Sequence, residues 1–274
     1  MSEELVISSD ALALTALVTG ASSGIGLEFC RQLAEQGINV ILVSNQVTEL
    51  AAARDSLAER HPNLRFWSYY KDLSEADAAQ ELYDYCRSNG ITVDILINNA
   101  GIFNFKETLS MTPERINIFI DLHMRTLTML CYLFGGDMKR RKSGFILNMS
   151  SMSCWAPMPG LSMYSSTKAY IRVFSRSLYY ELIEDGVGVT VACPGGIATD
   201  LFGLPENLKK LALALRAIST PQAFVKCALK HMFNRDKQFV DGWLNKLAII
   251  MVYFTPTWIR LIVKHKLLNK NVTR

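Results

Sequence analysis

The chain has 274 residues, 50% of them hydrophobic and 20% charged, a composition typical of a globular protein with a sizeable buried core. Its formal net charge of +4 is too small to indicate a nucleic-acid partner. The six cysteines stand singly and share no metal-ligand spacing with the four histidines, so we expect no metal site.

Strands and helices alternate in the predicted chain order. We expect a strand at 14–19, a helix at 24–37, a strand at 39–43, a helix at 48–60, a strand at 64–69, a helix capped by Ser74 and running to 88, a strand at 93–97, a long helix at 112–138, a strand at 145–149, a helix at 162–185 and a strand at 187–192. Strands rich in Val, Ile and Leu and separated by helices indicate a mainly parallel sheet covered on both faces.

The sequence therefore predicts a single doubly wound, Rossmann-type α/β domain over residues 1–274, since no flexible linker divides it. Beyond residue 200 the pattern is mostly helical, with a short edge strand at 238–240. We expect residues 201–274 to form a substrate lid and a helical C-terminal extension.

A glycine-rich segment joins the first predicted strand to the first helix. It reads Thr19-Gly20-Ala21-Ser22-Ser23-Gly24-Ile25-Gly26, with glycines spaced GxxxGxG. Glycine permits a tight turn and lets a phosphate approach the backbone, and a helix N-terminus offers unpaired N–H groups and a positive dipole end. A purely structural turn would use the same glycines, but the place after the first strand favours a nucleotide site.

Tyr164 and Lys168 lie four residues apart on a predicted helix, so their side chains share one face. A free tyrosine titrates near pH ~10, and a nearby lysine cation lowers that pKa by favouring the phenolate. Such a phenol could exchange a proton with a carbonyl or an alcohol. Taken alone, the pair better suits an ordinary amphipathic helix.

Five motifs, in order, resemble those of the short-chain dehydrogenase/reductase family. Residues 19–26 resemble its TGxxxGxG loop, and Asn98-Asn99-Ala100-Gly101 its NNAG motif. Ser151 resembles its catalytic serine, Tyr164 with Lys168 its YxxxK pair, and Pro194-Gly195 with Thr199 its PG motif and the threonine that follows. The resemblance covers about residues 12–200. It implies an NAD(P)-dependent oxidoreductase that transfers a hydride between a nicotinamide cofactor and a carbonyl/alcohol pair.

The resemblance also implies residue roles. Tyr164 would be the general acid/base, Lys168 would lower its pKa and bind the nicotinamide ribose, and Ser151 would donate to the substrate oxygen. Asp72 and Leu73 would contact adenine, although Asp72 also suits the turn before Ser74. The expected cofactor-binding residues are Gly20, Ser22, Ser23, Gly24, Ile25, Gly26, Asn45, Asp72, Leu73, Asn99, Ala100, Gly101, Tyr164, Lys168, Pro194, Gly195, Ile197 and Thr199.

Two positions depart from the family pattern. His123 stands where the family usually has an asparagine that supports a proton-relay water. A histidine can donate and accept hydrogen bonds, so we include His123 among the catalytic residues, with Asn117 as the other candidate for that position. A polar side chain satisfied inside the helix packing is the alternative.

After the second strand, Ser44-Asn45-Gln46 offers neither the acidic residue that favours NAD nor an arginine, so NADP(H) is favoured and NAD(H) is the alternative.

Apolar residues surround the catalytic motifs. Met149, Met152, Trp155, Met158, Leu161 and Met163 are soft and adaptable, and Met149, on a strand, suits the core better than a ligand site. Residues 201–215 form an apolar stretch that the family uses to close over substrate. We therefore expect a hydrophobic small-molecule carbonyl or alcohol as substrate.

The segment from Trp243 onward mixes apolar, aromatic and basic residues. An apolar run at 247–254 is broken around Pro256, and Trp258 and further apolar residues follow, with Arg260, Lys264, His265 and Lys266 among or after them. Such a mixture suits peripheral contact with a membrane surface, and equally a subunit interface or an end cap on the fold.

Location and assembly are also expectations. Met1 to Asp10 lacks the basic and apolar regions of a signal peptide, and no run of about 18 apolar residues predicts a membrane span, so we expect a cytoplasmic protein. The family resemblance implies a homodimer or homotetramer built through the long helices.

A second function stays open beside the oxidoreductase. A dinucleotide fold can keep its cofactor and lose its chemistry, and the missing asparagine gives weight to a catalytically weak or inactive sensor or scaffold. The intact Ser151, Tyr164 and Lys168 favour the enzyme, because a binder needs no acid/base pair.

Overall fold

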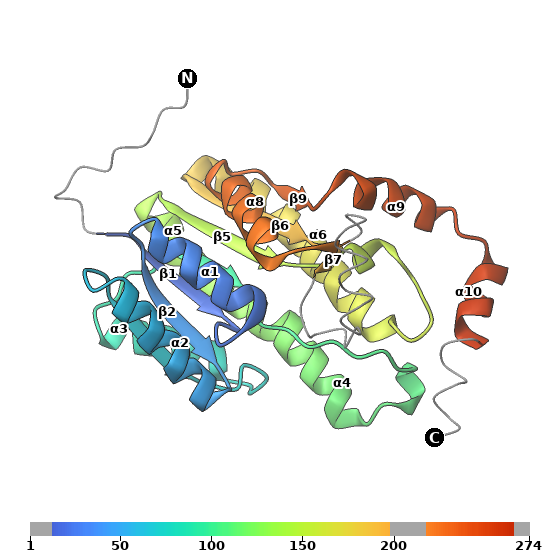
Figure 1. Cartoon of the computed structure of the whole chain (residues 1–274), viewed down its shortest axis with the longest axis horizontal. Helices are drawn as coiled ribbons and strands as arrows, with labels where there is room; N and C mark the ends of the chain where they lie inside the picture. The colour runs from blue at the N-terminus through green and yellow to red at the C-terminus, as the bar shows by residue number, and fades with distance from the viewer. Residues whose placement is uncertain (1–12, 198–217, 266–274) are drawn as a thin grey trace.

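A computed structural model describes residues 13–197 and 218–265 (Figure 1). The first half contains β1 (Thr15–Thr19), α1 (Gly24–Glu35), β2 (Asn39–Ser44), α2 (Val47–Arg60), β3 (Phe66–Tyr70), α3 (Ala78–Ser88), β4 (Ile95–Asn98), η1 (Thr108–Ser110), α4 (Pro113–Ile120), η2 (Asp121–Thr126) and α5 (Leu127–Arg141). The second half contains β5 (Gly144–Met149), η3 (Met152–Trp155), α6 (Ser162–Leu182), η4 (Ile183–Asp185), β6 (Val187–Cys193), β7 (Gly196–Ile197), β8 (Ile218–Ser219), α8 (Pro221–Phe233), β9 (Gln238–Val240), α9 (Trp243–Tyr253) and α10 (Thr257–Val263).

Seven strands form one sheet in the order β3-β2-β1-β4-β5-β6-β9, and every neighbouring pair is parallel. The chain moves outward from β1 to β3 and then returns to place β4 on the other side of β1. The strand order therefore reverses between β1 and β4, and the carboxyl ends of these strands border a crevice where such folds bind ligands. The predicted doubly wound, mainly parallel fold is confirmed, and β9 is the edge strand expected at 238–240.

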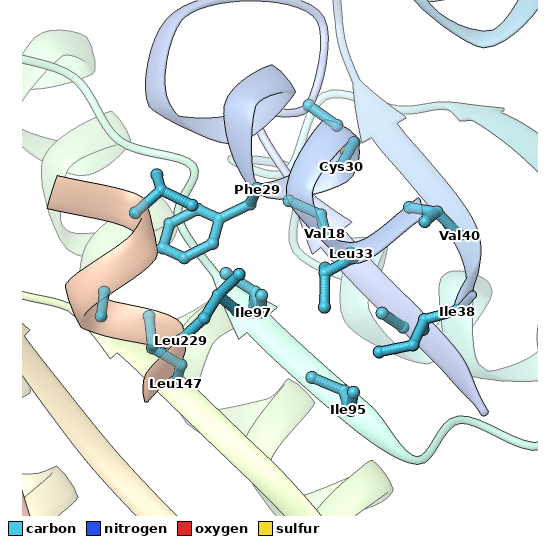
Figure 2. Close-up of a cluster of buried hydrophobic side chains, with 14 of the residues drawn as sticks. Val18, Phe29, Cys30, Leu33, Ile38, Val40, Ile95, Ile97, Leu147 and Leu229 are labelled. Atoms are coloured by element: carbon cyan, nitrogen blue, oxygen red, sulfur yellow. The ribbon is translucent and has the colours of Figure 1, made fainter. Parts of the chain in front are cut away.

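Helices cover both faces of the sheet. Helices α1, α2 and α8 pack on one face, where Figure 2 shows Phe29 and Leu33 of α1 close to Ile97 of β4 and Leu229 of α8. Helices α3, α5 and α6 pack on the other face through a second buried cluster. Strands buried from both sides explain the continuous apolar runs of the sequence.

Two predicted boundaries are wrong. The helix expected to begin at Ser74 begins at Ala78, because Ser74 instead donates from its backbone and its hydroxyl to the Asp72 carboxylate, at 2.9 and 2.7 Å. The helix expected at 112–138 is divided by the π-helical turn η2, which holds His123. Pro113 does occupy the first position of α4, as expected.

The helical run Pro113–Arg141 is long and apolar enough, by length and composition alone, to cross a membrane, and it is the one such helix in the part of the chain that the structure describes. Its buried residues include Leu127, Leu130, Phe134 and Met138, which belong to the cluster between α5 and the sheet. These side chains pack this part of the run against the sheet.

The C-terminal extension is helical over α9 and α10, which lie at one end of the molecule beyond β9 (Figure 1). The expected lid at 201–215 and Thr199 lie outside the described residues. The boundaries of the single domain, 1–274, and of its lid and extension, 201–274, stay predictions.

Candidate active site

A pocket of about 380 Å³ opens at the carboxyl ends of β1 and β4. Its lining includes twelve of the predicted cofactor residues: Gly20, Ser22, Ser23, Gly24, Ile25, Gly26, Asn45, Asp72, Leu73, Asn99, Ala100 and Gly101. The other lining residues are Ser44, Gln46, Lys71, Ile102 and Leu122. The glycine turn and the segment after β4 thus line one pocket, and its use as a cofactor site stays a prediction.

The glycine turn needs its glycines for two separate reasons. Gly20 and Gly24 adopt left-handed backbone conformations, with φ of +67° and +55°. Gly26 has an ordinary φ, but a side-chain carbon there would collide with the Gly20 carbonyl oxygen. The turn is therefore tight, and it directs the first N–H groups of α1 toward the pocket, where an anion can bind.

Asn99 stabilises the glycine turn through hydrogen bonds to its backbone. Its side chain donates to the carbonyl oxygens of Thr19 and Gly20, at 3.0 and 3.3 Å. The backbone N–H groups of Asn99 and Ala100 both donate to the Thr19 hydroxyl, each at 3.0 Å. The segment after β4 thus fixes the end of β1, so Asn99 acts on the pocket mainly by shaping it.

Asp72 is both a turn residue and a pocket residue. Burial alone would raise its pKa, but hydrogen bonds from Ser74 and Asn45 hold that pKa below its usual value. Lys71 beside it forms ion pairs with Glu75 and Glu81, at 2.6 and 2.5 Å. Asp72 can therefore both stabilise the turn before Ser74 and line the pocket, and its carboxylate is ionised at neutral pH.

Ser151, Tyr164 and Lys168 come together at the start of α6 and the end of β5, and all three are buried. The Lys168 ammonium donates to the Met149 carbonyl at 2.9 Å and lies 5.7 Å from the centre of the Tyr164 ring. Ser151 hydrogen-bonds the phenol. A side-chain carbon on Gly101 would lie 3.5 Å from Lys168 Nζ, so the trio borders the nucleotide pocket.

The expectation that Lys168 lowers the pKa of Tyr164 is contradicted. Burial raises the pKa of Tyr164, and the hydrogen bond with Ser151 opposes that rise only in part. Burial also lowers the pKa of Lys168 to about 8. The low-dielectric surroundings penalise both charged forms, the phenolate and the ammonium, so burial dominates over attraction between them.

His123 is buried in η2 with both ring nitrogens engaged. Nε2 accepts the Ile102 N–H at 3.0 Å, so Nδ1 carries the proton and donates to the Thr167 hydroxyl at 2.9 Å. Thr167 in turn donates to the Tyr164 carbonyl at 3.0 Å. Burial, then Lys168 and Arg115, lower the pKa of His123 well below its ordinary value. The ring is neutral and has no nitrogen left for a relay water, so the geometry favours a satisfied, positioning side chain over a catalytic one.

A second cavity of about 430 Å³ adjoins the trio. Tyr164, Ser151 and Gly195 face it, and its other walls are mainly apolar: Phe103, Phe105, Met152, Ser153, Trp155, Ala156, Leu161, Ile249 and Val252. The ring of Phe103 meets that of Tyr164 edge-on at 5.1 Å. The Tyr164 side chain therefore lines an apolar chamber.

Comparison with known proteins decides the family. The family model for short chain dehydrogenases matches residues 14–207, which is most of the chain. The chain belongs to the short-chain dehydrogenase/reductase family. Its members are usually NAD(P)-dependent oxidoreductases acting on a CH–OH/C=O pair, and the suspected family is thereby confirmed.

Several curated short-chain dehydrogenase/reductase relatives resemble most of the chain. The human very-long-chain 3-oxoacyl-CoA reductase is 28% identical over 90% of this chain and 77% of its own length. A hydroxysteroid dehydrogenase-like protein 1 from Gallus gallus is 32% identical, over 89% and 72%. The human protein named inactive hydroxysteroid dehydrogenase-like protein 1 is 26% identical, over 89% and 73%.

Solved structures of short-chain dehydrogenases share the fold. One from Sphingobium yanoikuyae, in complex with NADPH, is 25% identical with a TM-score of 0.75, and the match covers 89% of this chain and 97% of that chain. A 7beta-hydroxysteroid dehydrogenase reaches a TM-score of 0.81 at 21% identity, over 91% and 95%, which shows the fold alone.

Pro194 and Ile197, which were expected to border the nicotinamide, are not among the described residues that line the nucleotide pocket. Pro194 is buried, and its carbonyl accepts the Met152 N–H at 2.8 Å, beside the apolar cavity. Ile197 lies in β7. Met149 is a core residue, as expected, and the cavity lining includes Met152, Trp155 and Leu161 but, within the described residues, neither Met158 nor Met163.

Sequence reasoning missed Phe103, Phe105, Ile249 and Val252 in the cavity walls and Lys71 in the nucleotide pocket. Phe103 and Phe105 follow the NNAG motif closely, which could have pointed to them. Ile249 and Val252 come from α9, far along the chain, and only the folded arrangement brings them to the site.

Proposed function

We propose that this protein is an NADP(H)-dependent oxidoreductase that interconverts a hydrophobic carbonyl compound and its alcohol. The observation that carries the proposal is the position of Ser151, Tyr164 and Lys168 between two spaces. On one side lies the pocket formed by the glycine turn, and on the other lies the apolar cavity. A cofactor in the first and a ketone in the second would meet at the Tyr164 phenol.

The residues fit the cofactor that the family uses. The glycine turn admits a phosphate close to the backbone, the start of α1 offers N–H donors, and the crevice lies at the strand-order reversal. Ser22 to Gly26 would hold the pyrophosphate, Asp72 and Leu73 would border the adenine, and Lys168 would hold the nicotinamide ribose. When bound, the nicotinamide supplies or accepts the hydride.

Tyr164 moves the proton. Because burial raises its pKa, the phenol keeps its proton at neutral pH and can donate it to the oxygen of a ketone as the C–H bond forms. Ser151 offers a hydrogen bond to the same oxygen, where negative charge develops. The apolar walls exclude water from that oxygen, which strengthens both interactions. In the reverse direction the Tyr164 phenolate would take the proton from an alcohol.

The preference for NADP(H) over NAD(H) is part of the proposal. Among the described residues that line the nucleotide pocket, Asp72 is the one carboxylate, and hydrogen bonds from Ser74 already engage it. Lys71 also lines this pocket, with its ammonium paired to Glu75 and Glu81. The family as a whole uses NAD(P)(H), and the Sphingobium yanoikuyae relative was crystallised with NADPH.

Replacing Gln46 by glutamate tests this preference. Gln46→Glu places a carboxylate of similar size at the lining, where it would repel a ribose 2′-phosphate by about 1 kcal/mol, or roughly fivefold in Kd. We expect the Kd for NADPH to rise and the Kd for NADH to stay within about twofold. Gln222→Glu, on the exposed start of α8, adds the same charge as a matched control. Tighter binding of NADH than NADPH by the unchanged protein would contradict the preference.

A substrate panel tests the activity itself. NADPH oxidation should be measured with ketones and aldehydes that range from small polar compounds to steroid-like and long-chain acyl ketones. We expect turnover with the bulky apolar members, because the cavity of about 430 Å³ is lined mainly by apolar side chains. Turnover only with small polar carbonyls would contradict a hydrophobic substrate.

The alternative is a catalytically weak or inactive sensor or scaffold that binds a dinucleotide. One relative is named inactive, and this name supports the alternative of an inactive protein. The assembled Ser151, Tyr164 and Lys168 favour the enzyme, because cofactor binding alone requires no buried phenol facing a second cavity.

A homodimer or homotetramer and a cytoplasmic location also remain part of the proposal. Exposed apolar side chains on the long helices, namely Met129 and Tyr132 on α5 and Val173 on α6, support a subunit interface there. Gel filtration with light scattering would give the number of subunits, and a monomer at micromolar concentration would contradict it.

A further inference from the structure

Helix α9 has two different faces. Its inner face closes the apolar cavity through Ile249 and Val252 and contacts the short helix η3. Asn245, on the same face, packs so closely on Gly195 that a side-chain carbon there would collide with it. Helix α9 is therefore a wall of the cavity that holds the Tyr164 phenol.

The outer faces of α9 and α10 are apolar and exposed. On α9, Ile250 is 57% and Met251 67% exposed, and on α10 Trp258 is 62% exposed. The other exposed apolar residues of this surface are Leu244, Leu247, Phe254, Leu261 and Ile262. They recur at helical spacings of three and four, so each helix presents one apolar stripe. We call the exposed apolar residues of 244–262 the apolar surface.

The charged residues of segment 242–265 are all basic. They are Lys246, Arg260 and Lys264. Lys246 is exposed, and Arg260 links α10 to α9 by donating to the Val252 carbonyl at 3.4 Å. Lys264 approaches Glu107 of the loop before η1, at 3.5 Å. Apolar stripes with a tryptophan and a basic surround match an anionic lipid surface.

A second copy of the chain fits this surface less well. A two-fold contact would bring the same surface of both copies together, and hence the basic residues of one copy next to those of the other. Segment 242–274 has no acidic residue to pair with them. A lipid bilayer with anionic headgroups accepts both the apolar stripes and the positive charge.

We propose that α9 and α10 dock this protein on an anionic lipid surface through the apolar surface. Ile249 and Val252 line the cavity from the inner face of α9, so only the width of this helix then separates the cavity from the lipid. An apolar ketone dissolved in the bilayer therefore has a short path to Tyr164, and this last step rests on the proposed function.

Vesicle co-sedimentation of the full chain tests the docking without measuring turnover. The probes are vesicles of phosphatidylcholine with and without phosphatidylglycerol. We expect binding to the anionic vesicles, at least about tenfold weaker binding to the neutral ones, and weakening as salt is raised. The double variant Ile250→Glu with Met251→Glu should lose at least about tenfold in binding, and Lys246→Gln should lose part of the preference for anionic lipid.

Tyr70→Glu is the matched control. Tyr70 is 58% exposed on β3, the edge strand at the other side of the sheet from β9, and its variant should bind vesicles like the unchanged protein. Thermal unfolding of each variant shows that it is folded, and turnover of a water-soluble ketone tests the proposed function separately.

Three results would overturn the docking proposal. The first is failure of the unchanged protein to bind anionic vesicles, and the second is equal binding by the double variant. The third is a fall in subunit number on gel filtration when Ile250 and Met251 become glutamate, because this would assign the apolar surface to a second copy.

Discussion

Burial controls the proton affinity of the Tyr164 and Lys168 side chains. Their separation of four residues brings both to one helix face, but the same packing removes both from water. The pKa of Tyr164 rises and the pKa of Lys168 falls to about 8. Tyr164 therefore holds its proton at neutral pH, which is the protonation state that carbonyl reduction requires, although a raised pKa makes the phenol a weaker acid.

The depressed pKa of Lys168 makes stability depend on pH. Its pKa is about 8 in the folded chain and 10.5 in the unfolded one, so the unfolded chain binds more protons between these values. The free energy of unfolding therefore gains a contribution that rises with pH through this window, by about 2–3 kcal/mol. Lys168→Met removes the titrating group and keeps most of the apolar stem.

We expect the difference in unfolding free energy between the unchanged protein and Lys168→Met to shift in favour of the unchanged protein as the pH rises from about 7.5 to about 10. Urea unfolding without cofactor at both pH values measures this shift. A difference that stays constant with pH would contradict the depressed pKa.

His123 is expected to position the site without transferring a proton. His123→Ala removes the acceptor of the Ile102 N–H and the partner of Thr167, which should cost about 2–3 kcal/mol of stability and lower turnover while cofactor still binds. His123→Asn can keep a hydrogen bond with Thr167 and should restore part of the turnover, because an amide both accepts and donates.

The pH profile of kcat separates positioning from relay. A positioning role predicts the same profile for His123→Asn as for the unchanged protein, since His123 is neutral throughout the neutral range. A shifted pH profile of kcat in His123→Asn would indicate that His123 takes part in proton transfer.

At the scale of elements, the turn between β1 and α1 depends on the close approach of Gly26 to the Gly20 carbonyl. A methyl group at Gly26 would overlap the Gly20 carbonyl and approach the Asn99 side chain. Gly26→Ala should therefore weaken NADPH binding at least about tenfold and lower stability by about 1–3 kcal/mol. Fluorescence titration of NADPH and thermal unfolding measure the two effects.

Gly37→Ala is the matched control for this element. Gly37, after α1, has a φ of +78°, but a side-chain carbon there meets no atom within 4 Å. Alanine should cost about 1 kcal/mol through backbone strain and leave NADPH affinity unchanged. Equal losses of affinity in both variants would mean that the effect is general destabilisation and not the shape of the turn.

Sequence patterns predicted the strands better than the interruptions of helices. The strands carry runs of Val, Ile and Leu because both faces of the sheet are buried, and a run of this kind is visible in any single segment. The π-helical turn at His123 has no local signature, because it is set by bonds to Ile102 and Thr167 from other parts of the chain. The prediction for Ser74 is wrong for a local reason, because Asp72, two residues before it, takes its hydroxyl.

At the scale of the whole molecule, the fold brings ordered motifs to one edge of the sheet. The glycine turn, the segment after β4, and the Ser151–Tyr164–Lys168 group all follow strands or begin helices at the same edge, so the nucleotide side of the site could be predicted from their order. The walls of the apolar cavity could not, because Phe103 and Ile249 share no pattern and meet only after folding.

The central claim is that the Tyr164 phenol transfers the proton in a nicotinamide-dependent reaction. Tyr164→Phe keeps the ring that packs on Phe103 and removes only the hydroxyl. Tyr170→Phe, on the same helix, removes a hydroxyl that is hydrogen-bonded to Thr128 at 2.7 Å, and it is the matched control.

The decisive measurement is NADPH oxidation by both variants with the best ketone of the panel, together with the Kd for NADPH. The account predicts that Tyr164→Phe loses at least about a hundredfold in turnover with Kd changed by less than about threefold, and that Tyr170→Phe keeps its turnover. Turnover in Tyr164→Phe equal to that of the unchanged protein would contradict the account.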